Sequence, residues 1–155
     1  MNAQQAGNIP DGWAYALPTE AQWEYACRAG TSTAYSWGAT IASSNANYNW
    51  DGGANNGNDF KQTRDVGQYA SNLWGFFDMH GNVWEWTADA YEASYPSDNP
   101  AIDPVRLGNS SSNRVKRGAG WHDGPNNLRS ASRHNPHYSW RRHHIGFRVS
   151  LQKSQ

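Results

Sequence analysis

The chain has 155 residues, no net formal charge and a mean hydropathy of −0.93, with nine tryptophans and eight tyrosines. This length predicts one domain over residues 1–155, whose core the aromatic side chains can supply, since each buries about 150–250 Å². The aromatic content excludes a disordered chain, and the lone Cys27 excludes an intrachain disulfide and a cysteine-rich zinc site. No apolar run suits a membrane span and no signal peptide is recognisable, so we expect no membrane segment and leave the compartment open.

Charge is divided unevenly along the chain. Residues 1–113 carry four Lys/Arg and twelve Asp/Glu, a balance of −8, whereas residues 114–148 carry eight Lys/Arg and one Asp, a balance of +7. The two regions could attract each other, or the basic region could bind an acidic partner. We expect Arg129, Arg133 and Arg148 to be paired inside the fold, which would leave less exposed basic charge than the count indicates.

The first strong element in chain order is a helix. The opening residues, Met1 to Asn8, have the composition of a helix tail, as in a fragment of a longer protein. Pro18-Thr19-Glu20 and the following AQWEYACRAG predict a helix that ends near Gly30. Thr19 is the expected cap, and Gln22 three residues later completes a capping box.

Turn-forming residues dominate the middle of the chain. Residues 31–58 are rich in Asn, Asp, Gly and Ser, and so long an irregular stretch needs something to hold it, a hard cation being one candidate. We expect short strands at 63–66, 83–87 and 145–151, with a surface loop over 92–113. Short strands, one clear helix and long loops predict an α+β domain.

The motif GNVWEW at 81–86 holds a carboxylate between two tryptophans. In a strand, Trp84 and Trp86 share one face, and Glu85 points to the other. Asp78, Glu85 and nearby carbonyls could form an oxygen-only calcium site. A salt bridge between Glu85 and an arginine is the alternative that the chemistry alone favours.

Five motifs occur in a distinctive order along the chain: LPTEAQWEYACRAG (17–30), GNVWEW (81–86), RGAGW (117–121), LRSASR (128–133) and IGFR (145–148). This series resembles the formylglycine-generating enzyme, or sulfatase-modifying factor, family. The resemblance implies a variant C-type lectin-like fold, loop-rich with short antiparallel strands and few helices. It also implies that the family's N-terminal portion, with its first strand and helix, is missing.

The resemblance implies two structural calcium sites that cross-link loops. The ligands of the first would be Asn47, the Tyr48 carbonyl, Asn58 or Asp59, and the Phe60 carbonyl. Those of the second would be Asp78, the Gly81 and Val83 carbonyls, and Glu85.

The resemblance also bears on catalysis. Formylglycine-generating members bind copper(I) through two active-site cysteines, and the register from the motifs places Pro125 and Ser130 at those positions. Soft thiolates suit copper(I), and Cys27 belongs to the distant helix, so we expect neither copper nor formylglycine formation.

The segment 118–148 resembles the variable segment of proteins diversified by retroelements, which keep a frame and vary the surface between its members. Adenine-templated variation of codons with a fixed third-position cytosine cannot yield Lys, Glu, Gln, Met or Trp. Residues 122–144 contain no Lys, Glu, Gln or Met, and only Trp140 breaks the pattern. We expect Gly118, Trp121, Leu128, Ala131, Ile145, Gly146 and Phe147 to form a buried frame. The residues expected to line a ligand surface, called the variable-type face below, are His122, Asp123, Gly124, Ser132, His134, His137, Tyr138, Ser139, Trp140, Arg142, His143 and His144.

The favoured function is therefore a non-catalytic module that binds a protein or a glycan, with the oligomeric state left open. The alternative is an enzyme of the sulfatase-modifying-factor group with metal- or histidine-dependent chemistry, in which His134 and His137 would chelate an ion from one helical turn. Nucleic-acid binding through Arg141 and Arg142 is not expected, because most of the basic excess belongs to the frame.

Overall fold

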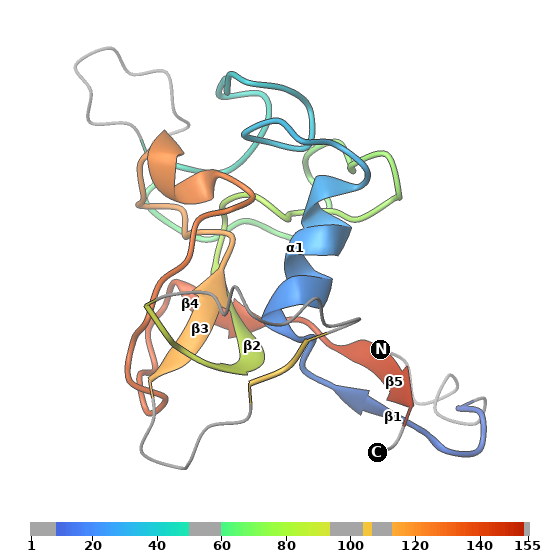
Figure 1. Cartoon of the computed structure of the whole chain (residues 1–155). Coiled ribbons are helices and arrows are strands. Elements are labelled where there is room, and N and C mark those ends of the chain that lie inside the picture. Colours follow the sequence, from blue (N-terminus) through green and yellow to red (C-terminus); the bar gives the residue numbers. More distant parts are fainter. Residues whose placement is uncertain (1–8, 50–59, 94–103, 107–112, 154–155) are drawn as a thin grey trace.

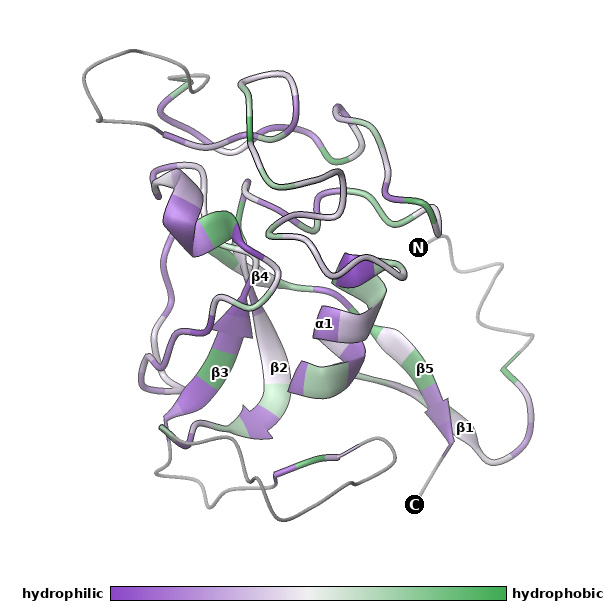
Figure 2. Cartoon of the chain, turned by 45° about the horizontal axis from the view of Figure 1, so that its top comes forward, coloured by the Kyte–Doolittle hydropathy of each residue, from purple (hydrophilic) through white to green (hydrophobic). Residues whose placement is uncertain are grey.

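The computed structural model describes residues 9–49, 60–93, 104–106 and 113–153. Within them, one α-helix, α1, spans Glu20–Arg28 and one 3₁₀-helix, η2, spans Pro125–Leu128. The strands are β1 (Trp13–Ala16), β2 (Trp84–Ala90), β3 (Arg114–Arg117), β4 (Ile145–Phe147) and β5 (Ser150–Lys153). Long loops fill the region above these elements, and hydrophilic and hydrophobic residues alternate along them (Figures 1 and 2). The loop-rich α+β fold is as the sequence predicts.

Helix α1 begins and ends where its local signals place it. The Thr19 hydroxyl accepts a hydrogen bond from the Gln22 amide at 3.1 Å, and the Gln22 side chain accepts one from the Thr19 amide at 2.9 Å. This completes the predicted capping box. The chain leaves the helix through Ala29 and Gly30, both with positive φ, and glycine takes this conformation without steric cost.

The strands form two separate sheets. Strands β1 and β5 pair antiparallel, and Trp13 lies opposite Lys153. The other sheet has the order β3-β2-β4, with β2 antiparallel to β3 and parallel to β4. Helix α1 packs beside this three-stranded sheet, and the β1–β5 pair projects from below it (Figure 1).

An extended segment adds to the outer edge of β3. His134 lies opposite Lys116, and His137 lies opposite Asn113, both in antiparallel bridges. The backbones of Lys116 and His134 exchange hydrogen bonds of 3.0 and 3.2 Å. Residues 134–137 therefore run alongside β3 as extended chain.

Buried apolar side chains form two clusters. One contains Trp23 and Cys27 of α1 with Met79. The other, larger cluster contains Trp84 and Leu128 together with Tyr35, Tyr48 and other loop residues. The loops thus contribute their own aromatic side chains to the core, as the composition predicts.

Two of the expected strands differ in the structure. Residues 63–66 form no strand, because the Asn82 side chain bonds both the amide and the carbonyl of Arg64 and takes the place of a neighbouring strand. The expected strand 145–151 divides into β4 and β5, which belong to different sheets. The loop expected over 92–113 lies largely outside the described residues.

Several expected frame residues are less buried than predicted. Gly118 and Leu128 are buried and Trp121, Ile145 and Gly146 are partly buried, but Ala131 is exposed and Phe147 is 68% exposed. Phe147 lies on the edge strand β4, where the alternation that buries one neighbour turns the next outward. No helix among the described residues is long and apolar enough to cross a membrane.

Candidate functional site

The three-stranded sheet presents two chemically different faces. Glu85 lies opposite Arg117 on β3 and Gly146 on β4, and its side chain points toward α1. Trp84 points to the opposite face, as the alternation predicts, and its ring contacts Lys116 and His134. The two faces therefore bury different charges, Glu85 on one side and Lys116 on the other.

The helix-facing side holds its described charges through ion pairs and, at Asp89, through two backbone amides. Glu85 accepts a hydrogen bond from the Trp23 indole at 2.6 Å and two from Arg148, at 2.5 Å from Nε and 2.7 Å from a terminal nitrogen. Arg117, which is fully buried, forms ion pairs with Glu24 and Glu20. Bidentate arginine–carboxylate pairs of this kind fix geometry strongly. These contacts hold the helix on the sheet.

The expected roles of the frame arginines are confirmed in two cases of three. Arg133 bonds both oxygens of Glu20, at 2.5 and 2.8 Å, and Arg148 bonds Glu85. Arg129 differs: it is exposed, and its guanidinium reaches only the Asn126 carbonyl, at 3.2 Å. It follows the η2 helix, where no carboxylate of the described residues pairs with it, and it lines an open cavity of about 340 Å³ with Arg28.

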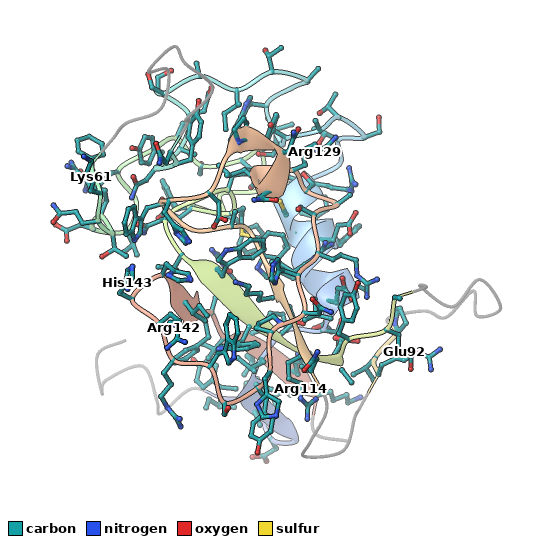
Figure 3. All side chains as sticks on the ribbon, turned by 90° about the vertical axis from the view of Figure 1, so that its left-hand side faces the viewer. Lys61, Glu92, Arg114, Arg129, Arg142 and His143 are labelled. Carbon is teal, nitrogen blue, oxygen red and sulfur yellow. The ribbon has the colours of Figure 1, made fainter. Side chains whose placement is uncertain are left out.

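The variable-type face lies on the other side of the sheet. Figure 3 looks onto this side, with Arg142 and His143 along one edge and Arg129 at its upper end. Eight of the twelve residues are exposed and four are partly buried: the exposed ones are His122, His134, His137, Tyr138, Ser139, Trp140, Arg142 and His143. None of the twelve is buried, although the strands beneath them are.

Three histidines of this face gather beside Trp121. The ring centroids of His122 and His144 are 4.1 Å apart, and those of His143 and His144 are 4.9 Å apart. Burial, then the charges of neighbouring groups including His122, lower the pKa of His144 to about 4, and its buried Nδ1 has no partner in the described part of the chain. His144 is therefore neutral at physiological pH.

A second group forms the tip of the face. His137 Nδ1 lies 2.8 Å from the Ser139 hydroxyl, and its ring packs on Tyr138 at 4.5 Å. The guanidinium of Arg142 lies 5.4 Å from the Trp140 ring, and both side chains are exposed. Aromatic rings and short polar groups thus share one surface.

The histidine pair proposed for a transition metal is not assembled as expected. His134 and His137 lie on extended chain, where positions three apart point to opposite faces, so the helical turn expected there is wrong. Among the described residues, no group of three His, Cys, Asp or Glu side chains has the arrangement of a metal site.

Cys27 and His80 form a thiol–imidazole pair that sequence reasoning missed. The Cys27 sulfur lies 3.5 Å from His80 Nε2, which also accepts a hydrogen bond from the Ser36 amide at 3.2 Å. Burial raises the pKa of Cys27 to about 12 and lowers that of His80 to about 4. Both groups are therefore neutral and enclosed, whereas a nucleophilic cysteine needs an accessible thiolate.

The first calcium site is partly described. Asn47 is buried, its amide nitrogen bonds the Gln62 carbonyl at 3.0 Å, and its buried Oδ1 has no partner among the residues that the structure describes. Tyr48 is buried beside it and Phe60 is exposed, whereas Asn58 and Asp59 lie outside the described residues. An orphaned amide oxygen between two loops fits a cation ligand.

Glu85, an expected ligand of the second calcium site, is paired with a guanidinium. Arg148 bonds Glu85, and it also donates to the Phe77 carbonyl at 3.1 Å. Burial opposes the charge of Arg148, but the Glu85 hydrogen bonds and the charges of Glu85 and Asp78 raise its pKa. Asp78 accepts a bond from the Gly67 amide at 2.7 Å. Gly81 is buried and Val83 partly buried in the turn between these two acids. The salt-bridge alternative thus describes the side-chain contacts of Glu85.

The fold is the C-type lectin-like fold in the form that the formylglycine-generating enzymes adopt. Residues 2–153 match the sulfatase-modifying factor enzyme 1-like domain, and the chain belongs to this family.

Similar proteins fall into more than one functional group. The formylglycine-generating enzyme of Mycobacterium tuberculosis is 38% identical over 116 residues, which cover 63% of this chain and 38% of that protein. Treponema denticola variable protein 1 superposes with a TM-score of 0.74 at 30% identity, covering 90% of this chain and 48% of that one. PvdO from Pseudomonas aeruginosa superposes with a TM-score of 0.75 at 30% identity, covering 89% of this chain and 52% of that one. The chain thus spans about half the length of the two solved structures, and its match to the mycobacterial enzyme covers 38% of that protein.

Proposed function

We propose that this chain is a non-catalytic ligand-binding module that displays a diversified surface, as in the variable proteins of diversity-generating retroelements. One observation carries the proposal: all twelve residues of the variable-type face are exposed or partly buried, although they interleave in sequence with buried residues such as Leu128 and Ser130. The structural similarity to a variable protein supports it. Residues arranged in this way can change while the fold stays.

The composition of the face supports binding of a protein or a glycan. Tyr138 and Trp140 are 50% and 43% exposed and supply rigid contact area, while Ser139 and the histidines supply adaptable hydrogen bonds. The alternative is an enzyme of the sulfatase-modifying-factor group with metal- or histidine-dependent chemistry, for which the described residues offer no group of three His, Cys, Asp or Glu side chains arranged for a metal. Formylglycine formation, which we do not expect, would need thiols where Pro125 begins η2 and Ser130 is buried, and Cys27 is enclosed. The proposal is therefore recognition without chemistry.

A displayed library tests the proposal. The codons of Ser132, His137, Tyr138, Ser139 and Arg142 would be randomised in the whole chain on the surface of yeast, with a control library randomised at five buried positions. We expect most members of the first library to resist protease, and binders of hen-egg lysozyme, used as an arbitrary target, to be recovered. A protease-resistant fraction as low as in the control library, or no binders from a well-folded library, would overturn the proposal.

We propose calcium as a structural ion at the first site, where the described residues fit it. Asn47 and the carbonyls of Tyr48 and Phe60 would hold it, and its charge would join the two loops that carry them. At the second site Arg148 already supplies the positive charge that Asp78 and Glu85 require. Calcium there would have to displace this guanidinium.

Thermal unfolding with and without calcium tests this assignment. We expect 5 mM calcium to raise the unfolding temperature of the natural chain, and Asn47→Ala to abolish the increase because the ligand oxygen is lost. Asn126→Ala, at an exposed amide elsewhere, serves as the control and should keep the increase. An increase retained by Asn47→Ala, or none in the natural chain, would contradict a calcium site at Asn47.

A further inference from the structure

Lys116 is a buried charge on the sheet face beneath the variable-type face. It lies in the middle of β3 and is 3% exposed. Its ammonium lies 4.2 Å from the centre of a Trp84 ring, and it forms no hydrogen bond with any described residue. An ammonium carries three donors, and the Lys116 nitrogen is not among the buried side-chain nitrogens that lack a partner, so water reaches it. An acceptor from a ligand could take the place of that water.

Burial lowers the pKa of Lys116 to about 8, and the charge of Asp123 opposes this shift, but Asp123 forms no hydrogen bond with the ammonium among the described residues. Asp123 is the only acid between residues 114 and 148, and its Oδ2 already accepts bonds from the Trp84 indole at 2.7 Å and the Gly120 amide at 2.9 Å. No ion pair joins Asp123 to Lys116 among the described residues. The acids that pair with Arg117 and Arg148 lie on the other side of the sheet.

Two imidazoles stand over the ammonium. His134 lies directly opposite Lys116 in the antiparallel bridge, on the same face, and is exposed, with its ring 5.4 Å from that of Trp84. After burial, the positive charge of Lys116 contributes to lowering the pKa values of both His134 and His144. Both rings therefore lie close to the ammonium, and His134 is exposed while His144 is partly buried.

We propose that the variable-type face recognises a carboxylate of its ligand, which reaches between His134 and His144 and pairs with the Lys116 ammonium. This inference rests on the proposed function, since it names the group that the binding face selects. The carboxylate would replace water at three unused donors in a partly desolvated site, where charge-assisted hydrogen bonds are strong. Asp123 keeps its own partners and does not compete.

The rim favours an acidic segment of a protein as the source of this carboxylate. Tyr138, Trp140 and Arg142 are exposed around the tip of the face, and flat aromatic side chains with a guanidinium are typical of surfaces that bind proteins. Arg142 has no carboxylate partner among the described residues, so the rim adds positive charge outside the Lys116 position. An Asp or Glu side chain from a partner would meet both.

Lys116→Met separates this role from a structural one. Methionine keeps most of the volume against Trp84 and removes the unpaired charge, so the variant should fold as well as the natural chain. Lys153→Met, at an exposed lysine on β5, is the matched control. Calorimetric titration with a hexaglutamate peptide at pH 7 and low salt measures binding, with hexaserine as the uncharged comparison.

We expect hexaglutamate to bind the natural chain and Lys153→Met equally, and to bind Lys116→Met about tenfold more weakly or worse, the range for losing one partner of a desolvated charge pair. Carbon-13 titration of the Lys116 side chain should also show its pKa rising when the peptide is bound. An equal loss in both variants would show diffuse attraction instead. Tighter binding of a sulfated hexasaccharide through Lys116 would replace the protein ligand by a glycan.

The two proposals fail separately. If lysozyme binders emerge from the displayed library but hexaglutamate does not distinguish Lys116→Met from Lys153→Met, the binding module stands and the carboxylate inference is wrong. If the library does not fold, the module itself is wrong, whatever the peptide does.

Discussion

Single charges on the two faces of the three-stranded sheet have opposite surroundings. Toward α1, Glu85 is 5% exposed and is held by Trp23 and Arg148, so each buried charge has a partner. Toward the variable-type face, Lys116 is buried against the Trp84 ring and forms no ion pair with a described carboxylate. A protein that stabilises itself with the first arrangement can reserve the second for a ligand.

The Glu85 contacts predict a large effect of a small change. Glu85→Gln would leave the partly buried Arg148 without its counter-charge, and we expect a loss of about 2–4 kcal/mol in the free energy of unfolding by urea. The control, Glu92→Gln, breaks the ion pair with Arg106, whose side chains are 48% and 46% exposed, and should cost about 1 kcal/mol or less. Equal effects of the two changes would show that the helix-facing pair is not a principal contact.

His144 predicts a loss of stability in acid. Its pKa is about 4 in the folded chain, against an ordinary value of 6.5, so between these pH values the unfolded chain binds more protons. The contribution of His144 is complete above pH 6.5 and is lost as the pH falls toward 4. Urea unfolding at pH 7.0, 5.5 and 4.5 should show a weaker decline in His144→Asn than in the natural chain. Identical declines would place His144 in contact with solvent.

At the scale of elements, helix α1 positions much of the site with one side. Its first-turn Glu20 receives Arg133 and Arg117, and its Trp23 meets Glu85, so the helix fixes both ends of the segment that carries the variable-type face. Its start is fixed in turn by Thr19.

Loss of the Thr19 cap should therefore weaken the whole domain. Thr19→Ala removes the hydroxyl that accepts from the Gln22 amide, and we expect a cost of about 1 kcal/mol in urea unfolding. Thr63→Ala, at an exposed threonine outside any helix, should change little. A cost for Thr19→Ala no larger than that of the control would mean that the capping box is dispensable.

Helix α1 was predictable because its signals lie within twelve residues of one another: Thr19, Gln22 and Gly30 each act locally. The alternation around Glu85 was predictable for the same reason. Pairing over long distances was not. Nothing near residues 148–149 indicates that the chain passes from one sheet to the other, since β5 finds its partner at Trp13–Ala16, far away in the sequence.

The position of the site was predictable from the sequence, but the burial of the residues beneath it was not. The motifs placed the variable-type face between buried residues, but Lys116 stands between Arg114 and Arg117 and has the local appearance of a solvated charge. Only the pairing of β3 with β2 and with residues 134–137 buries it. Phe147 and Arg129 show the opposite difference, since both were expected inside the fold and both are exposed. Hydrophobicity does not show that Phe147 lies on an edge strand, and motif membership does not show that Arg129 follows an exposed 3₁₀-helix.

Over the whole molecule, the uneven charge along the sequence becomes an internal attraction. Arg117, Arg133 and Arg148 of the basic region pair with Glu20, Glu24 and Glu85 of the acidic region. Lys116 and Arg142 lie on the side of the variable-type face and have no carboxylate partner among the described residues. The fold thus uses the acidic region for stability and leaves part of the basic region unpaired with it.

The central claim is that this surface is separable from the fold, and urea unfolding of two variants tests it directly. The triple variant Tyr138→Ser, Trp140→Ser, Arg142→Ser changes three exposed side chains of the face, whereas Leu128→Ala truncates a fully buried one. We predict that the triple variant stays within about 1 kcal/mol of the natural chain, while Leu128→Ala loses about 2–5 kcal/mol. A triple variant as destabilised as Leu128→Ala would contradict the claim, because the face would then be part of what holds the domain together.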